Sequence, residues 1–220
     1  MKKVDSWWFP DGEKHLPEWM ANAKNRIILN GRPSYQGKKQ LACINTVKKY
    51  KGTARMAVDV GGHVGLWSFN LAAAFEHVLA FEPVEAHRAC FARNVEAANV
   101  GLKACALGKE EGSVSIYTAP TSSGDSYVNG GGEIPMKTLD SFDLAEVDFI
   151  KIDCEGYEEN VLRGAEHLLK TWKPVVCVEQ KRDMASTRFG LAPLGAVKFL
   201  QTLGYGVEQE IGGDYIMVAK

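Results

Sequence analysis

Short apolar runs alternate with segments of helical periodicity from about residue 55 onward. The apolar runs predict strands over residues 55–60, 77–82 and 102–106, and the apolar spacing between them predicts helices over 65–75 and 85–98. An order of β-α-β-α-β is typical of a parallel sheet with right-handed crossovers. The pattern therefore predicts an α/β fold.

The later part of the chain continues this alternation after an irregular stretch. Alternating apolar and polar positions predict strands over 113–117 and 134–139, and the Ser- and Gly-rich segment 118–132 predicts a long flexible loop. A loop of that length in a compact domain is often a lid over a functional site. The remaining expected elements are a strand (147–153), a helix (158–170), a buried strand (173–179), a polar loop through 190, a helix (193–203) and a hairpin (205–210 and 214–218).

The first part of the chain lacks the alternation. Residues 1–54 are interpreted as an N-terminal cap or approach segment, and residues 55–220 as the domain that binds a ligand. With 220 residues, of which 45% are apolar, the chain is long enough for one globular domain with a full sheet core.

Charge and cysteine content narrow the class of partner. The 26 basic and 27 acidic residues nearly cancel, which argues against a nucleic-acid partner. No apolar run has the length of a membrane span, and the N-terminus lacks a signal-peptide core, so we expect a cytoplasmic protein without a membrane partner. The five cysteines are scattered without a C-x-x-C pair, which predicts reduced, mostly buried thiols.

Candidate chemistry begins where the first two predicted strands end. Asp59 ends the first strand and is followed by Gly61 and Gly65, and Glu82 ends the second strand about twenty residues later. The carboxyl ends of parallel strands meet at one edge of the sheet, where such folds bind ligands. Glycines allow a ligand to approach the backbone closely, and Glu82 is placed to accept both hydroxyls of a ribose.

Asp59 separates two kinds of nucleotide site. A dinucleotide site holds a pyrophosphate and carries G-x-G-x-x-G without a preceding acid, whereas this chain has Asp59-x-Gly61-x-x-x-Gly65. An acid repels a pyrophosphate but can bind the ammonium of an amino-acid tail, directly or through water. The predicted cofactor is therefore S-adenosylmethionine, and an NAD-dependent oxidoreductase is the alternative.

A second group of charged residues follows the later strands. The strand period places Lys151, Asp153 and, if the strand continues, Glu155 on one side, and Glu179 ends the next strand. Asp153 is expected near the cofactor, and Lys151 and Glu179 are candidates for binding the acceptor. A buried salt bridge between Lys151 and a carboxylate is the structural alternative.

Several motifs occur in a fixed order along the chain. They are Asp59-Val-Gly-Gly-His-Val-Gly65, Phe81-Glu-Pro83, Ala106-Leu-Gly108, Thr138-Leu-Asp140 and Ile150-Lys-Ile-Asp-Cys-Glu-Gly-Tyr-Glu158. Together they resemble the FkbM family of class I S-adenosylmethionine-dependent methyltransferases, from about residue 55 to the end of the chain.

The resemblance implies a fold, a reaction and further site residues. The fold is a Rossmann-like three-layer sandwich around a mostly parallel seven-stranded sheet with an antiparallel C-terminal strand, which agrees with the predicted terminal hairpin. The reaction is O-methylation, often of sugar or natural-product hydroxyls. The motifs place Pro83 beside Glu82 in the cofactor site and set the adenine against Ala106 and Leu107.

Removing the proton of a hydroxyl acceptor requires a base within hydrogen-bond reach. The candidates are Asp153, Glu155 and His63, in that order. Asp153, Glu155 and Glu179 could also offer three oxygen ligands to a metal ion, but the sequence requires no metal and none is predicted.

The acceptor is expected to be a small molecule or glycan. Aromatic residues of the N-terminal segment, Gln36 and loop 118–132 could form its walls, and Lys181, Arg182 and Arg188 could bind a phosphate or carboxylate group. A non-catalytic nucleoside-binding module with the same fold remains a further alternative.

Overall fold

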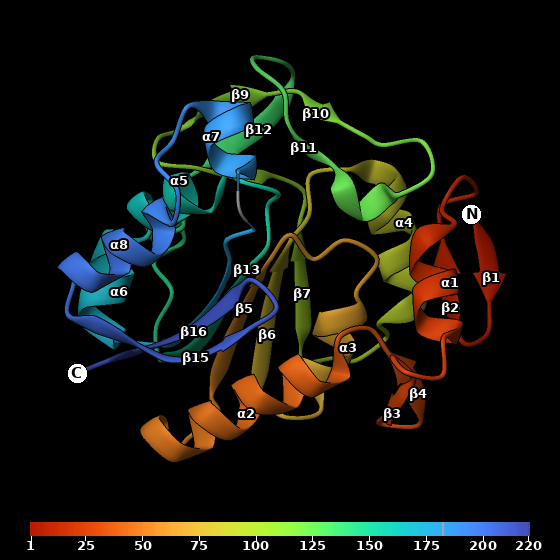
Figure 1. Ribbon diagram of the computed structural model, residues 1–220, viewed down its shortest axis with the longest axis horizontal. Coiled ribbons are helices and arrows are strands. Elements are labelled where there is room, and N and C mark those ends of the chain that lie inside the picture. The colour runs from red at the N-terminus through yellow and green to blue at the C-terminus, as the bar shows by residue number, and fades with distance from the viewer. Residues whose placement is uncertain (182) are drawn as a thin grey trace.

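A seven-stranded sheet forms the centre of the molecule (Figure 1). The computed structural model describes residues 1–181 and 183–220. The strands are β5 (Met56–Val60), β6 (His77–Phe81), β7 (Val100–Lys103), β13 (Val147–Ile152), β14 (Val175–Glu179), β15 (Tyr205–Ile211) and β16 (Asp214–Ala219). They lie in the order β15-β16-β14-β13-β5-β6-β7.

Strand direction confirms the predicted sheet. Strands β14, β13, β5, β6 and β7 pair in parallel, as expected for strands joined by crossover helices. Strand β16 runs antiparallel to both β14 and β15, so the C-terminal hairpin supplies the one reversed direction within this sheet.

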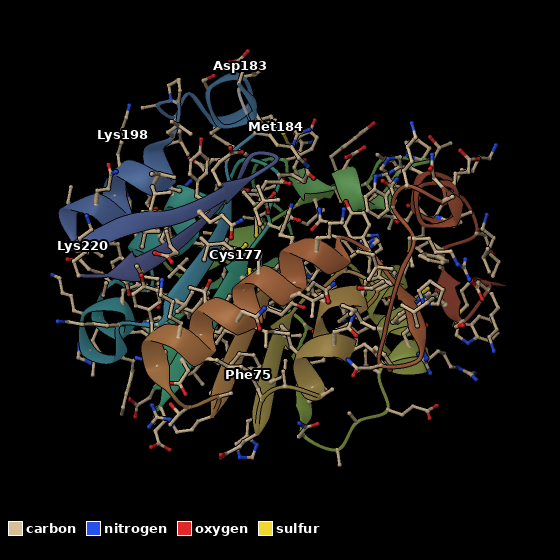
Figure 2. The ribbon with its side chains drawn as sticks, turned by 60° about the horizontal axis from the view of Figure 1, so that its bottom comes forward. Phe75, Cys177, Asp183, Met184, Lys198 and Lys220 are labelled. Carbon is tan, nitrogen blue, oxygen red and sulfur yellow. The ribbon has the colours of Figure 1, made fainter. Side chains whose placement is uncertain are left out.

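Helices cover both faces of the sheet, so the fold has three layers with the sheet in the middle. One face packs against α2 (Gly37–Lys51), α3 (Leu66–Ala72) and α4 (Glu85–Asn94), and the other against α5 (Glu158–Arg163), α6 (Glu166–Trp172) and α8 (Gly195–Thr202). Figure 2 shows α2 lying across the sheet near Cys177, with which Cys43 and Val47 of α2 share a hydrophobic cluster.

Burial on both faces explains the composition of the central strands. All six residues of β13 are buried, with Ile150 and Ile152 in the cluster under α5, α6 and α8, and Phe149 in the cluster under α2 and α3. A strand buried on both faces reads as a nearly continuous apolar run, and β13 interrupts that run only at Asp148 and Lys151.

The segment before residue 55 has two structural parts. The first consists of two small hairpins and a helix, namely β1 (Lys2–Val4), β2 (Trp7–Phe9), α1 (His15–Ala21), β3 (Ile27–Leu29) and β4 (Arg32–Ser34). Trp7, Phe9 and Leu16 pack with Val64 and Leu66 beside the main domain. The second part is α2, which belongs to the sandwich because it lies on the sheet.

Small elements lie beyond the carboxyl ends of the parallel strands. They are β8 (Ala106–Leu107), β9 (Gly112–Val114), β10 (Ile116–Tyr117), η1 (Ser123–Asp125), β11 (Tyr127–Val128), β12 (Ile134–Lys137), η2 (Asp140–Phe142) and α7 (Met184–Phe189). The segment expected as a long loop over 118–132 therefore contains a short helix and a strand paired with β10. The polar loop expected before residue 190 contains α7.

Several element boundaries differ from the sequence-based expectations. The strand expected over 102–106 lies at Val100–Lys103, and the helix expected over 85–98 ends at Asn94, whose side-chain amide donates to the carbonyls of Trp8 and Val64. The helix expected over 158–170 divides at Gly164, where a Cβ atom would lie 2.0 Å from the Gly108 carbonyl oxygen.

Two expectations from composition are tested by the described residues. All five cysteines are free, and four of them are buried, as predicted. Across residues 1–181 and 183–220, no helix combines the length and apolar character that crossing a bilayer requires.

Candidate functional site

The glycine loop after β5 is shaped by close backbone contacts. Gly61 has φ +76°, and a Cβ atom there would lie 2.1 Å from the carbonyl oxygen of Asp153. Gly65 has φ +89°, and its Cβ would lie 2.6 Å from the Val95 side chain. Both positions need glycine because the left-handed conformation and the lack of space act together. Gly61 faces the site, whereas Gly65 acts through the packing of α3.

Asp59 and Lys151 form a buried pair behind this loop. They are direct neighbours on adjacent strands, with Lys151 Nζ 3.2 Å from Asp59 Oδ1. Ser68 donates to the other oxygen of Asp59 at 2.6 Å. Lys151 Nζ also donates to the carbonyls of Val60 and Gly61, at 3.2 and 2.8 Å. The buried salt bridge that was the structural alternative for Lys151 is therefore present. Asp59 is fully buried and holds the glycine loop from behind.

A first cavity opens beside the loop and has a free volume of about 600 Å³. It contains most of the residues predicted to bind the cofactor, together with two cysteines and several aromatic side chains. Its predicted members are Gly61, His63, Glu82, Pro83, Ala106, Leu107 and Asp153, and its other members include Phe81, His87, Cys105, Ser123, Tyr127 and Tyr157. The cavity is therefore mostly apolar with a few polar groups, as expected for a nucleoside site.

Glu82 is held in one orientation at the wall of this cavity. One carboxylate oxygen accepts from the backbone N–H of His63 at 2.8 Å, and the other accepts from the backbone N–H of Val84 at 2.8 Å. His87 Nδ1 lies 3.1 Å from that second oxygen. A carboxylate offers about four acceptor positions, so one position remains for a ribose hydroxyl when these three groups are bound.

His63 connects the first cavity to the N-terminal segment. Its Nε2 lies 2.8 Å from Ser123 Oγ in η1, and Ser123 Oγ donates to Glu13. Burial, together with nearby His87 and Lys151, holds the pKa of His63 well below its ordinary value. The imidazole is therefore neutral at neutral pH and can accept a proton.

Three members of this group were not predicted from the sequence. His87 is five residues after Glu82, at a spacing that could have indicated it, because α4 begins between them. Ser123 and Glu13 meet across 110 residues, and no local pattern indicates that contact.

A second cavity, with a free volume of about 680 Å³, adjoins the first. Gly61, His63, Gly124 and Asp153 line both cavities. Side chains found only in the second include Tyr35, Trp67, Lys151, Glu155 and Lys181. Gln36 is not among the lining residues, and its Oε1 accepts from Trp67 Nε1 at 3.2 Å, so it contacts the cavity wall from behind.

Asp153 and Glu155, which line this second cavity, converge with Glu179, which lies beside it. Each offers a carboxylate oxygen that lies within 4.8 Å of the others. Strand β13 ends at Ile152, and Glu155 reaches the group through a left-handed backbone with φ +56°. The predicted convergence is therefore present, although it does not depend on a continuing strand.

The three acids are buried close together, and as a result their pKa values differ from one another. Burial opposes ionisation of Asp153, but the Lys151 charge, a hydrogen bond with Glu179 and the charges of Lys181 and Lys39 together keep the pKa of Asp153 below its ordinary value. Burial and the charge of Asp153 raise the pKa of Glu155 to about 7 and that of Glu179 to about 10. At neutral pH Asp153 is thus the ionised member, while Glu179 carries a proton.

Two basic residues bind the acids instead of forming an anion site. Lys181 Nζ pairs with Glu179 Oε1 at 2.5 Å, and Arg188 Nη1 lies 3.2 Å from Glu155 Oε2. Arg182, the third member of the predicted basic trio, lies outside the described residues.

Comparison with known proteins identifies a family model and a curated relative that match this chain. The family model described as Methyltransferase FkbM domain matches residues 59–206. A protein named Methyltransferase 1 from Beauveria bassiana (strain ARSEF 2860) is 29% identical over 143 residues, which cover 50% of this chain and 57% of that protein. The chain thus spans a little over half the length of this curated relative.

Solved structures share the fold at low sequence identity. An FkbM methyltransferase from Methylobacillus flagellatus KT has a TM-score of 0.52 and 18% identity, covering 75% of this chain and 43% of that one. A precorrin-6y C5,15-methyltransferase from Geobacter metallireducens GS-15 has a TM-score of 0.52 and 17% identity, covering 90% of this chain and 95% of that one. These likenesses confirm the Rossmann-like methyltransferase architecture.

Proposed function

We propose that this chain, which belongs to the FkbM family of methyltransferases, transfers a methyl group to a hydroxyl oxygen of a sugar or small natural-product-like acceptor. The cofactor of this methyltransferase family is S-adenosylmethionine. The first cavity would hold the adenosine part of the cofactor, and the second would hold the acceptor.

The residues of the first cavity fit a nucleoside. Glu82 is 4% exposed, yet its carboxylate lies on the cavity wall in an orientation fixed by backbone donors. Ala106 and Leu107 lie in a short strand whose backbone can contact the adenine edge, with Pro83 beside Glu82. Gly61 brings its backbone to the cavity wall, and the absence of a side chain makes room for the Asp153 carbonyl oxygen.

Asp153 carries the proposal, because it lines both cavities. When bound, S-adenosylmethionine supplies an electrophilic methyl group on a sulfonium, and S-adenosylhomocysteine remains after transfer. The acceptor oxygen gains a carbon bond and loses its proton. Asp153 accepts this proton as the ionised carboxylate of the group, and the loop and cavity walls align the reacting atoms.

Two other bases lie within the same region. Glu155 has a pKa of about 7, but its carboxylate is paired with Arg188. His63 is neutral but contacts Ser123. The order Asp153, Glu155, His63 therefore follows from charge state and from the partners that each group already has.

The two alternatives from other protein classes make different predictions. An NAD-dependent oxidoreductase would bind NADH, and Asp59 and the family membership both argue against it. A non-catalytic nucleoside-binding module would bind the cofactor product without turning over any acceptor.

Cofactor binding is tested by calorimetric titration with S-adenosylhomocysteine and, separately, NADH. Glu82→Ala should weaken S-adenosylhomocysteine binding at least tenfold, because each charge-assisted hydrogen bond contributes about 1.5–3 kcal/mol. Glu85→Ala, an exposed acid at the start of α4, is the matched control and should bind like the wild type. Binding of NADH in place of S-adenosylhomocysteine, or of neither ligand, would contradict the proposal.

Acceptor class is tested by measuring S-adenosylhomocysteine release from S-adenosylmethionine with panels of hydroxylated and amine acceptors. Release with hydroxylated sugars or natural products, with the product mass raised by one methyl group, supports the proposal. Turnover of amines alone would reject O-methylation, and cofactor binding without turnover of any panel would favour the non-catalytic module.

A further inference from the structure

We infer that Asp153, Glu155 and Glu179 form a binding site for a hard divalent cation, of the Mg²⁺ or Ca²⁺ class, beside the second cavity. The inference rests on the proposed function only in assigning the acceptor to that cavity. The cation site itself rests on geometry, on an unpartnered buried carboxylate and on charge.

The spacing of the three carboxylates fits a shared cation. One oxygen from each lies within 4.8 Å of the other two. Oxygens on opposite sides of Ca²⁺ are about 4.6–5.2 Å apart, and those around Mg²⁺ about 4.0–4.2 Å, given the usual metal–oxygen distances. The 4.8 Å limit is therefore compatible with the span of a Ca²⁺ shell and exceeds that of an Mg²⁺ shell, around which the carboxylates would have to close.

Glu179 is the independent indication that a ligand belongs here. Its side chain is 2% exposed, and within residues 1–181 and 183–220 neither carboxylate oxygen accepts a hydrogen bond. Lys181 pairs with Oε1, but Oε2 has no ion pair among the described residues. A carboxylate oxygen buried without a partner is costly, and a cation bound beside it would remove that cost.

The basic residues that the structure describes near the group leave Asp153 without a paired cation. Arg188 pairs with Glu155 and Lys181 with Glu179, whereas Lys151 is directed to Asp59. Across the part of the chain that the structure describes, Asp153 has no ion pair within 4.0 Å. Lys181 is 45% exposed, so its amine can move into solvent and leave space for the cation.

A cation at this position would also restrict which acceptors can bind in the second cavity. Because Asp153 and Glu155 face the second cavity, the ion can take further oxygen ligands from a molecule bound there. Divalent cations need six or more oxygen ligands, so an acceptor with two neighbouring oxygens would complete the shell better than an isolated hydroxyl. The ion lowers the pKa of a bound hydroxyl, and the oxygen of Asp153 that is free of the metal accepts the proton.

Titration of the full chain with Mn²⁺, followed by the electron paramagnetic resonance signal of the free ion, tests the site. We expect one ion per chain with a dissociation constant below about 1 mM, displaced by Mg²⁺ or Ca²⁺. Glu179→Gln and Glu155→Gln should each weaken binding at least tenfold. Lys181→Met should strengthen it severalfold, because a competing cation is removed. Glu166→Gln, an exposed acid on α6, is the control and should leave binding unchanged.

The same samples are titrated with S-adenosylhomocysteine to separate the two proposals. Bound S-adenosylhomocysteine without saturable Mn²⁺ binding overturns the cation site and leaves the methyltransferase proposal standing. Mn²⁺ binding that is equal in Glu179→Gln and wild type also overturns it. Mn²⁺ binding with the expected variant pattern, but without S-adenosylhomocysteine binding, supports the cation site and rejects the proposed function.

Discussion

Strand β13 has an acidic residue near each end, and the two lie in opposite surroundings. Asp148, near the start, accepts from Thr53 Oγ1 at 2.9 Å, from Arg55 N at 2.9 Å and from the Arg55 guanidinium at 2.7 and 3.0 Å. Asp153, just past the other end, has Glu155 and Glu179 as close neighbours. One strand thus carries a fully satisfied acid at one end and a crowded one at the other.

The difference follows from where parallel sheets place their ligands. At the start of β13, the donors of Thr53 and Arg55 bind Asp148 and so hold two parts of the chain together. At the carboxyl end the acids remain under-compensated because a ligand supplies the missing interactions. We therefore expect substitutions at Asp148 to change stability and substitutions at Asp153 to change activity.

The sharpest test of this contrast is Asp153→Asn. Loss of a general base should lower the rate of methyl transfer by about 10²–10⁴-fold, equivalent to roughly 3–5 kcal/mol in the barrier. The thermal midpoint should fall only modestly, because the lost attraction to Lys151 is partly offset by relief of repulsion from Glu155. Both are measured on the same sample, by S-adenosylhomocysteine release and by calorimetry. A rate within tenfold of wild type would assign the proton to Glu155 or His63.

Two glycines with positive φ allow the same comparison at the level of the backbone, one at the site and one away from it. Gly61 and Gly52 both have positive φ, +76° and +67°, but a Cβ at Gly61 meets the Asp153 carbonyl at 2.1 Å whereas nothing lies within 4 Å of one at Gly52. Gly52→Ala should cost about 1 kcal/mol of stability from left-handed strain alone. Gly61→Ala should cost about 2–4 kcal/mol, because overpacking is added.

Binding of S-adenosylhomocysteine distinguishes the two glycine variants further. Gly61→Ala should weaken it, since the loop must move away from Asp153, and Gly52→Ala should bind as tightly as wild type. Urea unfolding gives the stabilities and calorimetry the affinities. Equal losses in the two variants would show that the close contact at Gly61 has no energetic role.

A structural feature can be predicted from the sequence when the residues that cause it are neighbours in the chain. Strands β5 and β6 follow from apolar runs, and the meeting of Asp153 with Glu179 follows from both residues lying at the carboxyl ends of parallel strands. The pairing of Lys151 with Asp59 requires knowing that β13 lies beside β5. Sheet order is set by tertiary packing and is not encoded in either strand alone.

The contacts around His63 illustrate the part that local sequence cannot indicate. The imidazole meets Ser123 across 60 residues, and Ser123 meets Glu13 across 110. Ser123 lies in a segment whose composition predicts only a loop, yet η1 forms there and is held by the N-terminal segment. Such contacts depend on how two irregular segments pack together, for which no periodic pattern exists.

The last of the expected effects concerns Asp148 and depends on pH. Asp148→Asn should lower the free energy of unfolding by about 2–3 kcal/mol near neutral pH, because the buried Arg55 contacts lose their charged partner. The guanidinium is partly exposed, with 29% of its side chain accessible, which places the loss toward the lower end for a buried ion pair. Binding of S-adenosylhomocysteine should be unchanged.

The pH dependence has a definite sign. Burial opposes ionisation of Asp148, but the hydrogen bonds from Arg55 outweigh it, so its pKa in the folded protein lies below the ordinary value. Its stabilising contribution is therefore complete above the unfolded pKa of about 3.9 and is lost as the pH falls through the folded pKa. Urea unfolding at about pH 7 and about pH 3 should show a large difference between wild type and Asp148→Asn at the first pH and a smaller one at the second. The same difference at both pH values would mean that packing, and not the charge of Asp148, stabilises this end of the strand, and the contrast with Asp153 would then no longer be electrostatic.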